Sequence, residues 1–462
     1  MYRRVLLLVS VLSVLCVPAS YGNDPSQNKH WLLPEYQEYT LQWQALLADL
    51  GLLPPGWMDE SLEQQDHAIT QASLRLLALQ AELQGEDNIK GIHYLQDIWK
   101  SGMQRQFIEQ MTPQFSAFER LRAALHHQQA IAALPRPDLT ELAELGLGQA
   151  HPDLASLRQL IALRLQQILP SALEHRTVWD PPFELLLKEY QRRHGLAPSG
   201  RLDPATQKSL TLDPALRLQQ IRFSLLQWFQ LPSQLEGYSI LVNIPHFQLV
   251  VLNGERVELV LPVVVGKPQT PTPRMNSRFR SVTLNPTWTP PSSIVRNELL
   301  PAYRNNPSSL ASQGFYLSSA SQEVLPWEQV ELDGLEQQLG RYRLVQAPGR
   351  ANPLGKMRLN LTASDAIYLH DSNNKALFGH RQRAYSHGCV RVGEAEQVLQ
   401  YLASQETKDT ARRLELALGS RKTVTQRLQS SIGVYLVYMP AWASEGNGLV
   451  LKPDIYHLAS QG

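Results

Sequence analysis

The spacing of apolar residues changes at about residue 236, and this change constrains the fold more than any other feature. Before it, apolar residues recur at helical spacing in 74–83 and 154–168. After it, Ile240, Val242 and Ile244 occupy every second position, as on one face of a β-strand. The sequence therefore predicts an α+β multidomain protein, with a mainly helical scaffold over residues 23–170 and a β-rich domain over residues 236–405.

The β-rich domain begins with an antiparallel hairpin. Asn253-Gly254 is a strong turn signal between two apolar runs, and the second run spans 257–265. We expect a third strand over 278–284 and a further strand over 366–370. Residues 406–462 are predicted to add a helix and a strand that pack back on the scaffold or on the β-rich domain.

Residues 285–352 interrupt the strand pattern. The segment 285–293 is too rich in proline for a central strand. The polar chain that follows carries several aromatic residues, and long insertions of this kind often cover a functional groove. We therefore predict an inserted capping subdomain over 285–352; the alternative is a surface loop without a function.

A compact unit is predicted over residues 171–215. Pro181-Pro182 opens one helix, and Asp203-Pro204 is an N-cap followed by proline at the first helical position. The run YQRRHGLAPSGRLDPATQKSL (190–210) resembles the small three-helix peptidoglycan-binding module of cell-wall enzymes. An ordinary helical hairpin is the alternative, and binding is what the resemblance implies.

The first 22 residues have the pattern of a secretory signal peptide. Arg3 and Arg4 precede an apolar core, 5–17, that is shorter than the roughly 20 residues a membrane-spanning helix needs. Cleavage after Gly22 would leave an exported chain; an uncleaved anchor, and with it a link to the membrane, is the alternative. The formal net charge of +1 argues against a nucleic-acid partner, since such partners require a basic surface.

Removal of the signal peptide would also remove Cys16 and leave Cys389 as the sole cysteine. It lies in Ser386-His387-Gly388-Cys389-Val390-Arg391, and a thiol with an imidazole and a fixed cation nearby is typical of a cysteine-nucleophile site. In an extended segment the Arg391 side chain would lie on the same side as Cys389. The backbone N–H groups of Gly388 and Cys389 could form an oxyanion hole.

Three histidines compete for the role of the base. His370 closes the predicted strand 366–370, which would position it well for a hydrogen bond with the thiol. His387 lies in the loop and is expected to support it, and His380 is a weaker candidate. Tyr368 shares a strand face with His370 and should line the same groove.

These residues resemble the signature of L,D-transpeptidases with the YkuD fold. The segments NPTWTPPSSI (285–294) and QAPGRANPLGK (346–356) resemble the large periplasmic, YcbB-like members, which also have a helical scaffold, a peptidoglycan-binding module and a capping subdomain. The resemblance implies catalysis by Cys389 and His370 and a periplasmic location. Contacts with the oxyanion or substrate are implied for Ser386, His387, Gly388, Arg391, Tyr368 and Trp288.

The resemblance also implies a reaction: Cys389 takes the acyl group of a tetrapeptide stem, D-Ala leaves, and the side-chain amine of another stem accepts the acyl group in a 3→3 cross-link. The partners would be donor and acceptor stems of peptidoglycan, carbapenems would inhibit, and no metal or organic cofactor is required. Water as acceptor would give an L,D-carboxypeptidase, and another amine would give a different acyl transfer. A non-catalytic wall-binding protein remains a further alternative.

Two other enzyme classes find little support in the sequence. A serine penicillin-binding enzyme would use a Ser-x-x-Lys motif, but the string from Ser372 to Lys375 lies in an Asn-rich turn. A zinc peptidase of the H-E-x-x-H type lacks its motif here.

Overall fold

The computed structural model describes residues 31–32, 37–84, 89–132, 137–211, 213–330, 334–364, 366–445 and 448–460. The predicted signal peptide, residues 1–22, lies outside this part of the chain. The chain forms two compact units, which we call the helical unit (residues 1–235 and 437–462) and the barrel unit (residues 236–436). None of the described helices is long and apolar enough to cross a membrane.

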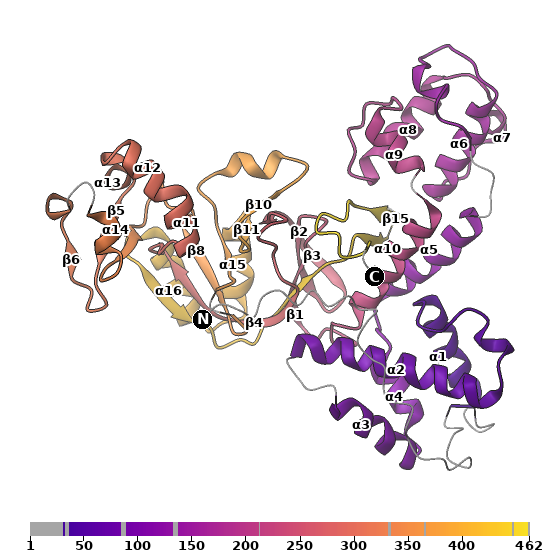
Figure 1. Ribbon diagram of the computed structural model, residues 1–462, viewed down its shortest axis with the longest axis horizontal. Coiled ribbons are helices and arrows are strands. Elements are labelled where there is room, and N and C mark those ends of the chain that lie inside the picture. The colour runs from indigo at the N-terminus through magenta and orange to yellow at the C-terminus, as the bar shows by residue number, and fades with distance from the viewer. Residues whose placement is uncertain are drawn as a thin grey trace. The chain divides into compact units, whose positions relative to one another are not determined.

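The helical unit confirms the helical periodicity of the N-terminal sequence (Figure 1). Its longer helices are α1 (Gln37–Asp49), α2 (Leu62–Gln84), α3 (Ile89–Lys100), α4 (Gln104–Met111), α5 (Ser116–Ala132), α6 (Asp153–Arg164), α8 (Pro181–Arg193), α9 (Pro204–Thr211) and α10 (Pro214–Trp228).

The end of the chain returns to this unit as a hairpin of β14 (Ala441–Ser444) and β15 (Gly448–Leu451), which packs on α5 and α10. The Trp442 ring stacks on Trp228 with 5.1 Å between centroids, and the Ala441 N–H donates to the Ser224 hydroxyl over 2.9 Å.

The segment predicted as a module over 171–215 shares its hydrophobic core with earlier residues. One cluster of buried side chains runs from Leu139 to Leu210, and α6 packs directly on α8. The compact body therefore includes α6 and begins well before residue 171. Asp203 accepts a hydrogen bond from the Thr206 N–H over 2.8 Å, which confirms the predicted N-cap of α9.

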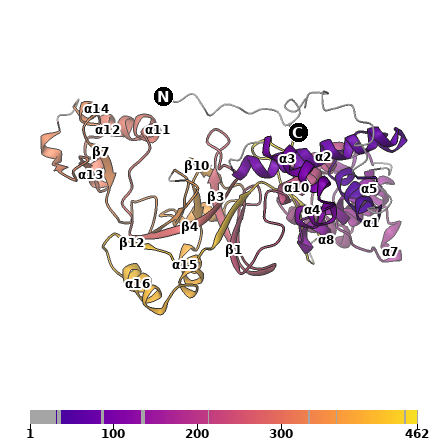
Figure 2. The ribbon, with the colours of Figure 1, turned by 90° about the horizontal axis from the view of Figure 1, so that it is seen from below.

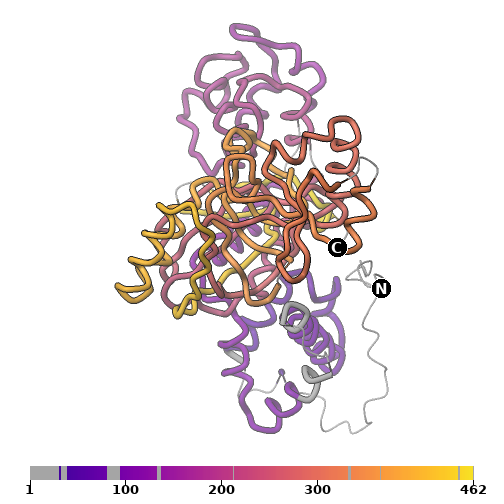
Figure 3. The backbone as a smooth tube through the Cα atoms, turned by 90° about the vertical axis from the view of Figure 1, so that its left-hand side faces the viewer, coloured from indigo at the N-terminus to yellow at the C-terminus, as the bar shows by residue number. Residues whose placement is uncertain are grey.

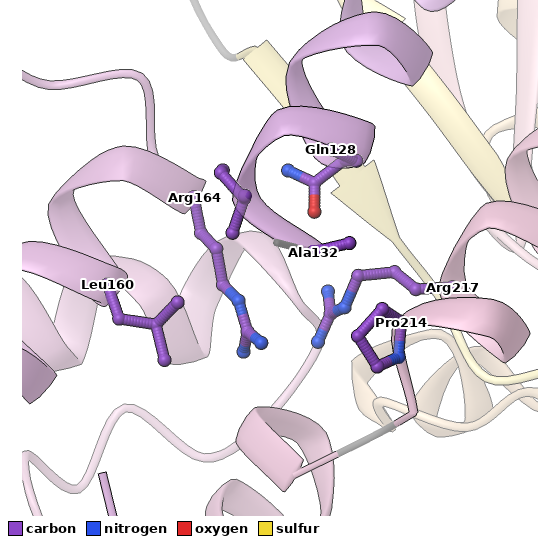
Figure 4. A pocket seen from close by; sticks show the side chains of 7 residues that line it. Gln128, Ala132, Leu160, Arg164, Pro214 and Arg217 are labelled. Atoms are coloured by element: carbon purple, nitrogen blue, oxygen red, sulfur yellow. The ribbon is translucent and has the colours of Figure 1, made fainter. Parts of the chain in front are cut away.

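A pocket between α5, α6 and the start of α10 receives two arginine side chains. Figure 4 shows Arg164 and Arg217 reaching into it from different helices. Both are almost fully buried, and their positive charges act on His194 nearby. Burial, together with these charges, lowers the pKa of His194 to about 3, so this histidine is neutral near pH 7. His194 stacks on Tyr190 and bonds its carbonyl, which is a structural role.

The barrel unit contains one sheet that closes on itself. The strand order is β10-β3-β11-β9-β8-β4-β13-β1-β2, β3 also pairs with β2, and β12 pairs with β4. The strands are β1 (Tyr238–Asn243), β2 (Gln248–Asn253), β3 (Arg256–Gly266), β4 (Met275–Leu284), β8 (Met357–Leu361), β9 (Leu369–His370), β10 (Ala384–Ser386), β11 (Val390–Val392), β12 (Val424–Arg427) and β13 (Gly433–Val437).

The predicted hairpin is confirmed, since Asn253 pairs with Arg256 across a two-residue turn in which Gly254 has a φ of +59°. The strand predicted over 366–370 is wrong in its first half, because only Leu369 and His370 join the sheet. The N–H groups of Ala366 and Ile367 donate instead to the Ser364 hydroxyl, so they cannot donate to a neighbouring strand.

Two helices, α15 (Ala395–Ser404) and α16 (Lys408–Gly419), follow β11 and pack against each other. Figure 3 shows them, in yellow, on one side of the barrel unit. Helix α16 contacts β4 and β12 of the barrel unit, whereas β14 and β15 belong to the helical unit.

The inserted segment is a small subdomain with its own core, which we call the cap (residues 285–352). It lies beyond the ends of β4 and β8 (Figure 2). A three-stranded sheet of β6 (Val324–Leu325), β5 (Phe315–Ser318) and β7 (Arg343–Gln346) packs with α11 (Ser292–Ile294), a π-helical turn η5 (Val295–Leu299), α12 (Leu300–Asn305), α13 (Ser308–Ser312) and α14 (Leu335–Gln338).

Trp288 belongs to this cap core. Its backbone pairs with Gln346, and its ring lies 6.1 Å from that of Phe315. The side chain is half-buried against the core of the cap, and its predicted contact with substrate stays a prediction. Trp288 therefore attaches the first residues of the cap to the cap's own sheet, β6-β5-β7.

Gly355 offers a test of how tightly the segment before β8 is packed. It has a φ of +59°, and a Cβ there would lie 2.3 Å from an Asp371 carboxylate oxygen. We expect Gly355→Ala to lower the free energy of unfolding by about 2–4 kcal/mol in urea titrations, through backbone strain and overpacking. Gly419→Ala, where a Cβ meets no atom within 4 Å, is the matched control. Equal stability of the two variants would contradict this packing.

Candidate active site

The parallel pair β9 and β11 brings the predicted catalytic residues to one place. Leu369 faces Val390 and His370 faces Arg391 in the register, and the Val390 N–H donates to the Tyr368 carbonyl over 3.2 Å. The strand β11 is held on its other side by β3. Cys389 therefore enters the sheet immediately before β11, next to Tyr368.

His370 is buried and held in one orientation. Its Nδ1 lies 2.5 Å from the backbone carbonyl of Asp371, which can only accept a hydrogen bond. Nδ1 therefore carries the proton, and Nε2 of the neutral ring has a lone pair. Burial and the positive charge of Arg391 lower the pKa of His370 to about 3. The imidazole is thus neutral near pH 7 and can accept a proton there.

The thiol of Cys389 is less acidic than the sequence led us to expect. Burial raises its pKa, although hydrogen bonds from Tyr368 and the charges of Arg358 and Arg391 act in the opposite direction. Among the described residues its hydrogen bond goes to the Ala366 carbonyl, at 3.4 Å, and none joins it to His370. The predicted thiol–imidazole bond is not formed here, because the register places Cys389 beside Tyr368.

Ser386 fastens the turn that carries the thiol. Its buried hydroxyl donates to the Cys389 carbonyl over 2.6 Å and accepts from the Gly388 N–H over 3.1 Å. The Gly388 N–H is therefore engaged within the turn, which differs from the predicted oxyanion hole. The Ser386 hydroxyl stabilises this turn, and the predicted contact of Ser386 with substrate stays a prediction.

Thr272 provides a second fastening, which the sequence analysis missed. The hydroxyl of this buried residue donates to the Gly388 carbonyl and accepts from the Gly266 N–H, both over 2.8 Å. A Cβ at Gly266 would lie 2.2 Å from the Thr270 carbonyl, so the loop 266–272 is closely packed. Only the Gly266-Lys267 turn after the apolar strand could have indicated this loop.

Gly388 itself has a φ of +115°, which side-chain-bearing residues rarely adopt. A left-handed residue just before the nucleophile turns the chain sharply into β11. The glycine of the predicted motif is therefore required by backbone geometry.

Tyr368 and Arg391 lie where the sequence predicted them, beside the thiol. The Tyr368 ring is 5.6 Å from the His370 ring, and the Arg358 guanidinium lies over it at 4.7 Å. Burial raises the pKa of the Tyr368 hydroxyl, so this group is protonated and can donate to the sulfur. Arg358 was not anticipated, since nothing in its sequence neighbourhood distinguishes it.

His387 makes its contacts away from the thiol. Its Nε2 lies 3.1 Å from the Glu298 carboxylate of the cap and 3.4 Å from the Lys267 ammonium. His380 packs edge-on against Tyr385, with 5.8 Å between the ring centroids. His370 is the one of the three that lies on the strand paired with β11.

The Ser372-x-x-Lys375 string has a structural explanation. Lys375 pairs with the buried Asp371 carboxylate over 2.5 Å and donates to the Gly393 carbonyl over 2.7 Å. Ser372 is buried and accepts from the Asn374 N–H. Both side chains therefore stabilise the turn after His370. In the described part of the chain, no group of three or more His, Cys, Asp or Glu side chains is placed to hold a metal ion.

Known proteins resemble the barrel unit. Residues 237–445 match the YkuD family, described as the L,D-transpeptidase catalytic domain. A Haemophilus influenzae protein named as a proposed L,D-transpeptidase is 34% identical over 217 residues, which are 47% of this chain and 44% of that protein. The chain thus matches less than half the length of this curated relative.

Solved L,D-transpeptidases also align with the chain. One from Stackebrandtia nassauensis is 13% identical, with 66% of this chain and 97% of that chain covered and a TM-score of 0.24. Another, LdtMt1 in complex with imipenem, is 12% identical, with 44% and 59% covered and a TM-score of 0.20. Scores this low do not establish a common arrangement of the whole chains.

The protonation of the thiol provides a test of this site. Because burial raises the pKa of Cys389, the reactive thiolate forms only at alkaline pH, and the rate of alkylation by iodoacetamide at Cys389 should rise through a midpoint above the ordinary value of roughly 8.5. Arg391→Met removes a charge that favours the thiolate, so its midpoint should be higher still. Arg413→Met, on the exposed pair with Asp409, is the control. A midpoint below 8 in the native protein, by peptide mass spectrometry, would contradict the assigned shift.

Thr272 gives a second test, of stability. Thr272→Val keeps the shape of the side chain but removes the hydroxyl that bonds the Gly388 carbonyl and the Gly266 N–H. We expect a loss of about 2–4 kcal/mol in the free energy of unfolding. Thr272→Ser retains the hydroxyl and should recover most of this loss. If valine and serine variants unfold at the same urea concentration, the hydroxyl does not fasten the turn.

Proposed function

We propose that the protein is a cysteine-nucleophile acyltransferase that forms 3→3 cross-links between peptidoglycan stems. The observation that carries the proposal is the pairing of β9 with β11 inside a YkuD domain, which brings a buried neutral histidine and a single thiol to adjacent strands.

In the first step, the Cys389 sulfur attacks the carbonyl of the third stem residue. The thiol starts protonated, because burial raises its pKa, so its proton must leave as the sulfur–carbon bond forms. The Nε2 lone pair of His370 is the proposed acceptor, which requires the sulfur to come within hydrogen-bond distance of the imidazole. Release of D-Ala with that proton then leaves a thioester.

Positive charge surrounds the reacting atoms. Arg358 and Arg391 both act on the sulfur, and Tyr368 offers a hydroxyl donor. We propose that these groups stabilise the tetrahedral oxyanion. The Gly388 N–H is not assigned this role, because it already donates a hydrogen bond to the Ser386 hydroxyl. The Cys389 N–H stays a predicted donor.

The remaining sequence predictions belong to the same proposal. The chain is proposed to be exported to the periplasm through its signal peptide, where it meets the cell wall. The body that includes α6, α8 and α9 is proposed to bind peptidoglycan. Carbapenems are the expected inhibitors, since they are acyl donors whose attack by Cys389 leaves a stable thioester. No cofactor has a part in this chemistry.

The experiment is incubation of the mature protein with disaccharide-tetrapeptide, followed by mass spectrometry. We expect a cross-linked dimer that lacks one D-Ala, and no product from Cys389→Ala. His370→Ala should lower the rate of cross-linking about 10²- to 10⁴-fold, which is the usual contribution of a positioned general base. His380→Ala should retain most of the native rate. Tripeptide alone would assign an L,D-carboxypeptidase. Undiminished activity of Cys389→Ala would refute the mechanism.

A further inference from the structure

Three buried polar side chains meet in the pocket at the ends of α5 and α6 and the start of α10. Gln128, Arg164 and Arg217 come from these three helices, and each has no more than 4% of its surface exposed. Figure 4 shows their polar ends reaching into the same space, which we call the arginine pocket. It lies within the helical unit, and the proposed acyl transfer does not use it.

The protein satisfies Arg217 only in part. Its Nη2 donates to the Ser209 carbonyl over 2.5 Å, but its Nε has no hydrogen-bond partner in the described part of the chain. Arg217 also forms no ion pair with a described carboxylate. The Asp213 carboxylate, one helical turn earlier, accepts from the Ala215 N–H. A buried cation without a counter-ion is costly, because its lost hydration is not replaced.

Gln128 has an unmet need of the same kind, without a charge. Its amide forms no hydrogen bond with any described residue, although the side chain is buried. Most buried side-chain amides in native proteins have a hydrogen-bond partner. A ligand in the pocket would supply that partner, since the amide nitrogen can donate to it.

The electrostatic field in and around the pocket is positive. Burial raises the pKa of Tyr190, but the charges of Arg217 and Arg164 outweigh burial and lower it. The same two charges and that of Lys452 lower the pKa of His194, which is neutral near pH 7 and offsets none of them. The carboxyl-terminal ends of α5 and α6 each contribute only roughly half an elementary charge of the opposite sign. An anion would supply the full negative charge that Arg217 lacks.

The remaining walls of the pocket show which anion fits. They are apolar and consist of Ile131, Ala132, Leu160 and Pro214. Phosphate and sulfate would need donors around all four of their oxygens, which these walls do not offer. A carboxylate is planar and matches the forked guanidinium group. A short apolar group attached to the carboxylate would contact the apolar walls.

We propose that the arginine pocket binds a small carboxylate that carries a short apolar group. Its oxygens accept hydrogen bonds from the guanidinium groups of Arg164 and Arg217 and from the amide of Gln128. This chemistry is shared by free short-chain carboxylates and by the carboxyl end of a peptide whose last side chain is small. The proposal is independent of the acyl-transfer reaction, because all of its residues belong to the helical unit.

The experiment is isothermal titration calorimetry of the full mature protein with sodium acetate. The sodium salt of HEPES, whose sulfonate is too bulky for the pocket, keeps the ionic strength constant. We expect acetate to bind and to raise the Tm above that in the HEPES salt alone. Arg217→Met should raise the Kd for acetate about 10- to 100-fold, as for a lost charged hydrogen bond, and Gln128→Leu about 2- to 10-fold.

Two further variants keep the result interpretable. Arg217→Lys retains the charge without the fork and should bind acetate with a Kd between those of the native protein and Arg217→Met. Arg105→Met, which removes an exposed ion pair with Glu109 on α4, is the matched control and should leave the Kd unchanged. Far-UV circular dichroism identifies any variant that fails to fold, and the Gln128→Leu and Arg217→Lys variants then carry the test.

The probes also separate the two sources of a carboxylate. N-acetylalanine represents the carboxyl end of a peptide: a Kd as low as that of acetate would support a peptide end as the ligand, and binding of acetate alone would support a free carboxylate. Chloride and phosphate are the competing anions. Chloride or phosphate bound as tightly as acetate, with the same dependence on Arg217, would overturn the carboxylate as ligand.

Two other results would overturn the site itself. Absence of acetate binding to the native protein would mean that the helix ends and the protein's own hydrogen bonds already satisfy the arginines. An equal Kd in the native protein, Arg217→Met and Gln128→Leu would place the anion elsewhere. Neither result bears on the proposed acyl transfer, which is measured with a different substrate and depends on Cys389.

Discussion

The site depends on one backbone pairing, that of β9 with β11. Two short strands, joined in parallel and flanked by β8 and β3, fix where His370 and Arg391 face each other and where Cys389 enters the sheet. Parallel neighbours require a crossover connection, and here the loop 371–389 supplies it. That loop therefore has to carry the nucleophile, and it is fastened at several points by buried hydrogen bonds.

Burial decides the resting protonation of the site. An imidazolium and a thiolate would both have to lose their hydration in this interior, which costs several kcal/mol per ion in real proteins. The lowered pKa of His370 and the raised pKa of Cys389 show that the neutral pair is preferred. The proton therefore stays on the sulfur at rest, which also protects the Cys389 thiol from oxidation, since the thiolate is the reactive form.

Much of the fold could be predicted because its signals are local. The Asn253-Gly254 turn, the Asp203 N-cap and the change from helical to strand spacing depend on neighbouring residues only. The same holds for the residues of the Cys389 turn, where Gly388 has a backbone angle that favours glycine.

The parts that sequence reasoning missed depend on contacts between distant residues. Thr272 bonds Gly388 across 116 positions, and Arg358 reaches Tyr368 from another strand. Neither residue is marked by its neighbours. The hydrogen bond of the Gly388 N–H is a similar case: the N–H could be counted from the sequence, but its bond to the Ser386 hydroxyl depends on the exact course of the turn. The prediction for Trp288 relied on its aromatic side chain. Its backbone pairing with Gln346 determines where the ring packs.

The sequence that follows β4 explains why the chain forms the cap. The proline-rich segment after β4 cannot continue a central strand, so the chain leaves the barrel there and builds a second core before it returns at β8. That excursion is long enough to place Glu298, from a different subdomain, within 3.1 Å of His387 in the nucleophile turn. The insertion therefore connects a second core to the nucleophile turn through the contact of Glu298 with His387.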